Sequence, residues 1–68
     1  MNKALLRSIM VLHGETNKDL AEVLGLTEQS VCAKINENKG SEFKQGEIAK
    51  IKEHYNLSAE EVINIFFA

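Results

Sequence analysis

The sequence predicts an all-α protein, a compact bundle of five short helices. Apolar residues recur at helical spacing in five segments of the 68-residue chain, and most of these segments follow a residue type that caps helices. The chain contains no Pro, and no segment alternates apolar and polar residues as a β-strand does. A chain of this length forms one domain at most, so we expect residues 1–68 to fold around a single thin core.

The first expected helix runs from Lys3 to His13. Asn2 belongs to the residue types that cap helix starts, and Gly14 to those that end helices. The apolar stripe of this segment consists of Leu5, Leu6, Ile9, Met10 and Leu12. We expect this stripe to face the core.

The second expected helix runs from Asn17 to Leu24. Thr16 is its cap, and Asp19 lies in the first turn, where the helix dipole favours a negative charge. Gly25 ends the helix, because Gly adopts the left-handed conformation at little cost.

The third expected helix has the clearest start. Thr27 caps it, and Glu28 lies at the positive end of the helix dipole. Leu26 before the cap and Val31 after it have the spacing of a hydrophobic staple, which fixes the angle at which the helix leaves the turn. Val31 and Ile35 are expected in the core.

A polar loop over residues 36–41 ends the third helix, and the fourth is expected from Gln45 to Tyr55. Lys44 stands before this helix, with Glu47 three residues later. Because Lys cannot cap a helix start as Ser or Thr does, half of a capping box is missing here.

The fifth expected helix follows Ser58, which forms a capping box with Glu61, and continues to the end of the chain. We expect Phe66 to pack mainly in the core. Phe67, next to it, is expected to supply an exposed apolar surface for a second copy of the chain. Both residues are therefore candidates for a dimer interface.

Residues 16–36 carry the functional prediction. They place two short helices on either side of a three-residue turn, Gly25 to Thr27. Ala21 gives the small side chain needed where the helices cross, and Val31 fills the gap between them. This spacing indicates a helix-turn-helix, whose second helix can enter the DNA major groove. An ordinary helical hairpin within a small bundle is the alternative.

The stretch from Thr16 to Ile35 resembles the helix-turn-helix of the Xre and lambdoid Cro/repressor family. Nearly the whole chain resembles small regulators of phages and mobile elements in that family, including the run Ile-Lys-Glu-His-Tyr-Asn-Leu-Ser and the terminal Val-Ile-Asn-Ile-Phe-Phe. The resemblance implies a five-helix lambda-repressor-like DNA-binding domain. It also implies a transcriptional repressor that binds operator DNA, commonly as a dimer on palindromic sites.

Carried onto this chain, the resemblance makes the first residues of the third helix the candidates for base contacts. They are Thr27, Glu28, Gln29 and Ser30, with Lys34 one turn later on the outer face. Gln29 can pair with adenine N6 and N7 through two hydrogen bonds. Glu28 can accept a hydrogen bond from cytosine N4, or it can serve only to stabilise the helix dipole; both interpretations stay open.

Candidates for phosphate contacts lie at the start of the second helix and in the loop after the third. The N–H groups and dipole at a helix start attract phosphate. The candidates are Asn17, Lys18, Asn36, Asn38, Lys39 and Lys44. A solvated polar loop is the alternative for the last four of these residues.

The net charge of −2 is unusual for a DNA-binding domain, because phosphate contacts supply much of the affinity. A single copy with few basic residues would bind DNA weakly. We therefore expect a homodimer whose two copies bind half-sites about one helical turn apart on double-stranded DNA.

Composition also argues against other classes. The sequence contains no run of about 18 apolar residues, the length needed to span a membrane. Cys32 is the only cysteine, so we expect a cytoplasmic protein without disulfides. His13 and His54 do not have the spacing of metal ligands, so we expect no metal site. The sequence shows no catalytic group of residues and no site for a cofactor or small molecule, so we expect no cofactor and no enzymatic activity. The alternative function is a protein-interaction module, antirepressor-like or antitoxin-like, which uses the same fold without specific DNA binding.

Overall fold

The computed structural model describes residues 1–67, and within them it contains five α-helices, one 3₁₀ turn and no strand. The helices are α1 (Lys3–Leu12), α2 (Asn17–Leu24), α3 (Glu28–Ile35), α4 (Gln45–His54) and α5 (Ala59–Phe66), and the 3₁₀ turn η1 covers Asn38–Gly40. The predicted all-α fold class is confirmed over this range. The predicted domain and fifth helix also include Ala68, which lies outside the described residues.

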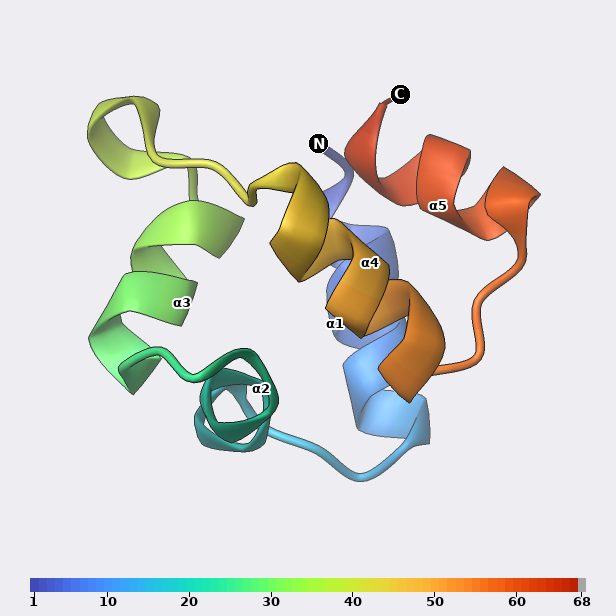
Figure 1. The fold of residues 1–68 in the computed structure, drawn as a ribbon, viewed down its shortest axis with the longest axis horizontal. Coiled ribbons are helices and arrows are strands. Elements are labelled where there is room, and N and C mark those ends of the chain that lie inside the picture. The colour runs from blue at the N-terminus through green and yellow to red at the C-terminus, as the bar shows by residue number, and fades with distance from the viewer. Residues whose placement is uncertain (68) are drawn as a thin grey trace.

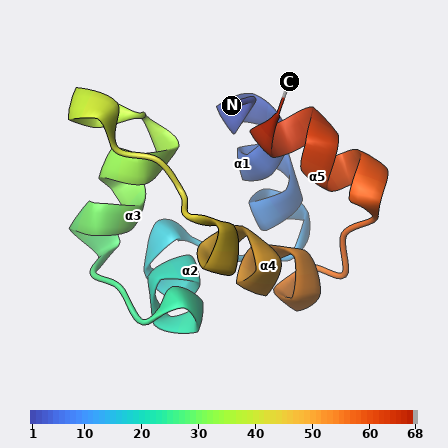
Figure 2. The same ribbon diagram turned by 45° about the horizontal axis from the view of Figure 1, so that its top comes forward.

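The helices form two groups, α2 with α3 and α1 with α5, and α4 contacts both groups (Figure 1). α3 packs on α2, α2 packs on α4, and α4 and α1 both contact α5. Figure 2 shows the same order from a second direction, with α3 at one end of the molecule and α5 at the other. This arrangement leaves the outer side of α3 without a helix against it.

One hydrophobic core joins the two groups. Every α-helix contributes at least one residue to it, and the link before α4 and the segment between α4 and α5 contribute the others. The buried residues are Leu6, Met10, Leu20, Ala21, Leu24, Val31, Ile35, Phe43, Ile51, Tyr55, Leu57 and Ile65. Because this core is small, each buried residue contributes a large share of the free energy of unfolding.

The predicted helix starts are confirmed, each with its expected cap. Asn2, Thr16, Thr27 and Ser58 all accept a backbone N–H from the third residue after them. α4 differs, because Lys44 makes no side-chain cap bond while Glu47 Oε1 accepts the Lys44 N–H at 2.9 Å. The predicted half of a capping box is therefore what the structure shows.

Two helix ends and one core residue differ from prediction. α1 and α4 each end one residue early, with His13 and Tyr55 as their C-terminal caps. Leu12 was expected in the buried stripe of α1 but is 82% exposed, and Val11 beside it is 75% exposed. At about 100° per residue, Leu12 lies roughly 160° around the helix from the buried Met10, so it faces away from the core.

The two ends of the described chain lie together. The Asn2 N–H donates to the Ile65 carbonyl oxygen at 2.6 Å, which joins the start of α1 to the last turn of α5. Figure 1 shows the N and C marks close to each other, on the opposite side of the molecule from the start of α3.

Candidate nucleic-acid interface

The turn between α2 and α3 is closed by backbone geometry. Gly25 has φ 70° and ψ 29°, the left-handed conformation, and the Leu26 N–H donates to the Ala21 carbonyl oxygen at 2.9 Å. The Ala21 carbonyl also accepts the Gly25 N–H, so two N–H groups of the turn close the end of α2. The chain therefore reverses within three residues, as the sequence predicts.

The position of α3 on α2 is fixed by apolar packing. Ala21 is 3% exposed, which lets the two helices approach closely, and Val31 and Ile35 of α3 are fully buried. Because all three side chains lie in the same core cluster, α3 presents its opposite face and its start to solvent.

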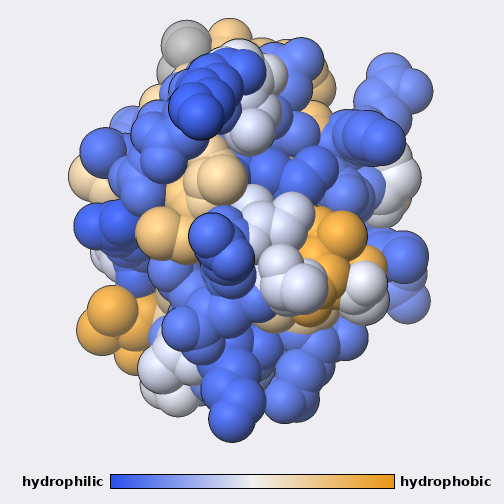
Figure 3. Space-filling model, turned by 90° about the vertical axis from the view of Figure 1, so that its left-hand side faces the viewer, coloured by the Kyte–Doolittle hydropathy of each residue, from blue (hydrophilic) through white to orange (hydrophobic). Residues whose placement is uncertain are grey.

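The start of α3 is polar and accessible. Thr27, Glu28 and Gln29 are exposed and Ser30 is half-buried. The Ser30 N–H donates to Thr27 Oγ1 at 3.1 Å, so the Thr27 hydroxyl caps the helix while its own proton stays available to another acceptor. Figure 3 shows the side of the molecule that carries α3, and its surface is mostly hydrophilic with scattered apolar areas.

Gln29 has the largest number of free hydrogen-bonding groups among these residues. Its side chain makes no hydrogen bond to another of the described residues, so both its amide donor and its carbonyl acceptor face solvent. Glu28 is likewise exposed, in the first turn of α3.

The end of α3 is organised differently from expectation. Lys34 was expected free on the outer face, but its side chain is 14% exposed. Its Nζ donates to Glu47 Oε1 at 3.0 Å and to the Glu42 carbonyl oxygen at 3.3 Å. The expected position of Lys34 is therefore wrong, because a carboxylate on α4 is within reach and holds the amine against the protein.

Asn36, which caps the end of α3, is also engaged within the protein. Its Nδ2 donates to the Cys32 carbonyl oxygen at 3.1 Å, and its Oδ1 accepts from Lys3 Nζ at 3.3 Å. These contacts tie the end of α3 to α1, so the Asn36 side chain is less available to phosphate than predicted.

The loop after α3 presents three of the remaining phosphate-contact candidates. Asn38, Lys39 and Lys44 are all exposed. Glu37 and Lys39 have φ values of 53° and 52°, a left-handed conformation that is uncommon outside Gly. The loop therefore holds a defined turn at the end of α3, with two lysines on its surface.

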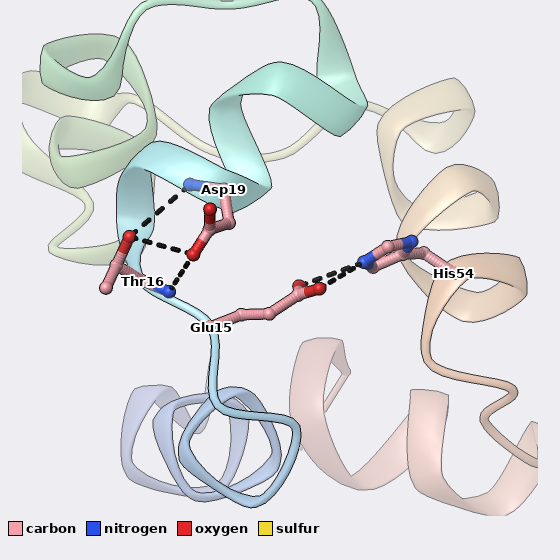
Figure 4. Close-up of polar contacts among 4 residues, drawn as sticks. All are labelled: Glu15, Thr16, Asp19 and His54. Carbon is pink, nitrogen blue, oxygen red and sulfur yellow. Dashed lines mark hydrogen bonds and ion pairs between the residues drawn. The ribbon is translucent and has the colours of Figure 1, made fainter.

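The start of α2 carries the other two candidates. Asn17 is half-buried and Lys18 is exposed. A capping box precedes them, in which Asp19 Oδ2 accepts the Thr16 N–H at 2.8 Å and the Thr16 hydroxyl at 3.1 Å (Figure 4). These hydrogen bonds from Thr16 hold the pKa of the Asp19 carboxyl below its usual value.

Glu15, just before α2, reaches across to the last residue of α4. Its two carboxylate oxygens lie 2.9 and 3.0 Å from His54 Nε2 (Figure 4). The hydrogen bond with His54 lowers the pKa of Glu15. No local sequence pattern indicates this contact, which joins segments 39 residues apart and steadies the start of α2 against α4.

The end of α5 has an exposed aromatic ring beside a hollow with a mixed polar and apolar lining. Phe67 is 65% exposed, while Phe66 is half-buried with its ring at 83° to the ring of Phe43, at 6.0 Å between ring centroids. Both phenylalanines line a hollow of about 350 Å³, together with Phe43, Ile48 and charged residues that include Lys34 and Lys44. The predicted division, with Phe66 largely packed and Phe67 outside, agrees with these positions.

Within residues 1–67, no group of three or more His, Cys, Asp or Glu side chains is arranged to hold a metal ion. No helix in this range is long and apolar enough to cross a membrane. Cys32 is a free, half-buried thiol on α3, next to the Asn36 side chain.

Comparison with known proteins adds no relative: no family model, no curated protein and no solved structure matches this chain. The class that the structure itself defines is a small five-helix protein with an exposed polar helix start at a tight turn.

Proposed function

We propose that this chain is a sequence-specific DNA-binding regulator, a repressor of the Xre and Cro type, which acts as a homodimer. In this proposal α2 and α3 form a helix-turn-helix, and the start of α3 enters the major groove of operator DNA. The repressor blocks a promoter by occupying it, without a cofactor.

The start of α3 supports this proposal most directly. An amide side chain, Gln29, stands free in the first turn of a helix whose position is fixed by buried Ala21, Val31 and Ile35. Base recognition requires such a rigid support, because a bidentate contact tolerates little change in distance. Thr27 and Ser30 add hydroxyl groups beside Gln29 that can donate or accept.

Phosphate contacts would flank this point on two sides. Lys18 and the N–H groups in the first turn of α2 would bind one phosphate, and Lys39 and Lys44 would bind the phosphates along the loop after α3. Lys34 and Asn36 are not part of this contact set, because both side chains are engaged within the protein.

A second copy supplies the affinity that one copy lacks. The exposed Phe67 ring is the contact that we propose for a two-fold dimer. This dimer would present two copies of α3 to two half-sites.

The decisive experiment is selection of duplexes from a random-sequence library by the purified protein, followed by binding measurements at two salt concentrations. We expect the enriched duplexes to contain inverted half-sites. Gln29→Ala should weaken binding to the enriched site by about 1–3 kcal/mol and leave binding to random duplex nearly unchanged.

Gln45→Ala is the matched control, because Gln45 is also an exposed glutamine at a helix start but lies on α4. It should leave both affinities unchanged. If no sequence is enriched, or if Gln29→Ala weakens binding to random and selected duplex equally, α3 does not read bases and the proposal fails.

A protein-interaction module is the second candidate function. The net charge of −2 and the exposed pair Val11 and Leu12 on α1 favour it. A stable stoichiometric complex with a defined protein partner, recovered while no duplex binds, would favour this function over DNA binding.

A further inference from the structure

One carboxylate oxygen joins α3 to the start of α4. Glu47 Oε1 accepts the Lys44 N–H at 2.9 Å and the Lys34 amine at 3.0 Å. The side chains of Lys34 and Glu47 are 14% and 16% exposed, so the pair lies largely out of solvent. Among the side-chain contacts of the described residues, this pair is the direct polar link between α3 and α4.

We propose that Glu47 is a positioning residue of the DNA-binding face with two effects. It fixes the end of α3 against α4, and it keeps the charge of Lys34 away from DNA phosphates. The second effect rests on the proposed function, whereas the first does not.

The physical basis is the length and flexibility of a lysine side chain. Lys34 lies one turn beyond the exposed start of α3 and carries its charge on four methylene groups. With Glu47 ionised, a charge-assisted hydrogen bond holds the amine inward. Without that charge only neutral acceptors hold the amine, among them the Glu42 carbonyl oxygen at 3.3 Å, and the amine gains more by returning to water, where it could reach a phosphate.

A released Lys34 would change the kind of binding as well as its strength. A phosphate contact raises the affinity for any sequence, and each one steepens the dependence of log affinity on log salt by about 0.9. Glu47 therefore favours discrimination between operator and random DNA at the expense of total affinity.

Glu47→Gln is the informative substitution. Glutamine Oε1 can still accept the Lys44 N–H and preserve the start of α4, while the negative charge is lost. Glu53→Gln is the matched control, because Glu53 is an exposed carboxylate on the same helix and its loss changes the net charge equally.

The first measurement is the affinity for random duplex and for the selected site across a range of salt. For Glu47→Gln we expect severalfold tighter binding to random duplex, a salt slope steeper by about 0.9, and a smaller ratio of specific to random affinity. Lys34→Met in addition should return the slope to that of the native protein. Equal slopes for Glu47→Gln and Glu53→Gln would overturn the effect on Lys34.

The second measurement needs no DNA and separates this inference from the proposed function. Unfolding constants of the native protein, Lys34→Met, Glu47→Gln and the double variant form a thermodynamic cycle. We expect a coupling of up to about fivefold in the unfolding constant, which corresponds to a pair energy of roughly 1 kcal/mol. Additive effects would overturn the positioning of α3 by Glu47, even if the protein binds DNA.

Discussion

The two ends of α3 differ in how much of their side-chain chemistry is free. At the start, the exposed Gln29 side chain has no hydrogen-bond partner among the described residues. The Thr27 hydroxyl accepts only the Ser30 N–H of the cap, and its own proton remains free. At the end, Lys34 is bonded to Glu47 and Asn36 to Lys3. One short helix is therefore divided: its end is attached to the rest of the protein, and the polar side chains at its start remain accessible.

The most severe test removes the attachment of α3 to the core. Ile35 is fully buried, so Ile35→Ala should leave a cavity and lower the free energy of unfolding by about 2–5 kcal/mol. Gln29→Ala, at the exposed start of the same helix, should change it by less than about 0.5 kcal/mol. Chemical denaturation of both variants measures the difference, and similar losses would show that the start of α3 is also structural.

A smaller loss of stability is expected when the glycine of the turn before α3 is replaced. Gly25 has φ 70°, and nothing lies within 4 Å of an added Cβ, so Gly25→Ala should cost about 1–2 kcal/mol through backbone strain alone. Gly46 lies in the helix α4 with equal space around it, and Gly46→Ala should instead stabilise the protein by up to about 1 kcal/mol. Melting temperatures of the two variants should therefore move in opposite directions, and a shift in the same direction would contradict the turn geometry.

The cap at the start of α3 should contribute less again. Thr27→Ala removes the acceptor for the Ser30 N–H and should lower the free energy of unfolding by about 1 kcal/mol. Thr27→Ser keeps the hydroxyl and should cost little. Thermal unfolding of the pair separates the cap from the methyl group, and an equal loss in both would mean that the methyl group matters more than the hydrogen bond.

The smallest expected effect is a pH-dependent loss of stability from Glu47, which holds the end of α3 through Lys34. Burial raises the pKa of Glu47, but the Lys44 N–H and the Lys34 amine together outweigh it, and the pKa lies below its usual value of 4.5. A carboxyl with a lowered pKa contributes stability above its unfolded pKa, and the protein loses that contribution as pH falls through the folded pKa.

Native protein should therefore lose up to about 1 kcal/mol more than Glu47→Gln between pH 6 and pH 3. Denaturation at a series of pH values checks this. Other carboxyls, such as Asp19, titrate in both proteins and cancel in the comparison. Parallel stability curves for the two proteins would show that Glu47 gains nothing from its ionised form.

Much of the fold was predictable because it is encoded locally. The caps at Thr16, Thr27 and Ser58 and the left-handed Gly25 depend on residues within one turn, so the sequence shows them directly. The start of α3 was predictable for the same reason.

The errors arose where distant segments decide the outcome. Whether Lys34 is free depends on α4, which brings a carboxylate to its amine from 13 residues away, and spacing within α3 carries no sign of it. Leu12 is exposed because no helix among residues 1–67 covers that side of α1, which composition does not reveal. The Glu15 to His54 contact joins the two ends of a 39-residue interval. Glu47 was noticeable in the sequence, but only as a partner for the start of its own helix.

The hydrogen bond from Asn2 to Ile65 has a practical consequence. The two ends of the described residues, 1 and 67, lie near each other and away from the start of α3 (Figures 1 and 2). A fluorophore or fusion partner attached at either end would therefore stay clear of the start of α3, but it would lie near Phe67, the proposed dimer contact. A short flexible linker could also join the two ends and allow the chain to be opened in the exposed turn at Lys39 and Gly40, giving a circular permutant in which α5 precedes α1.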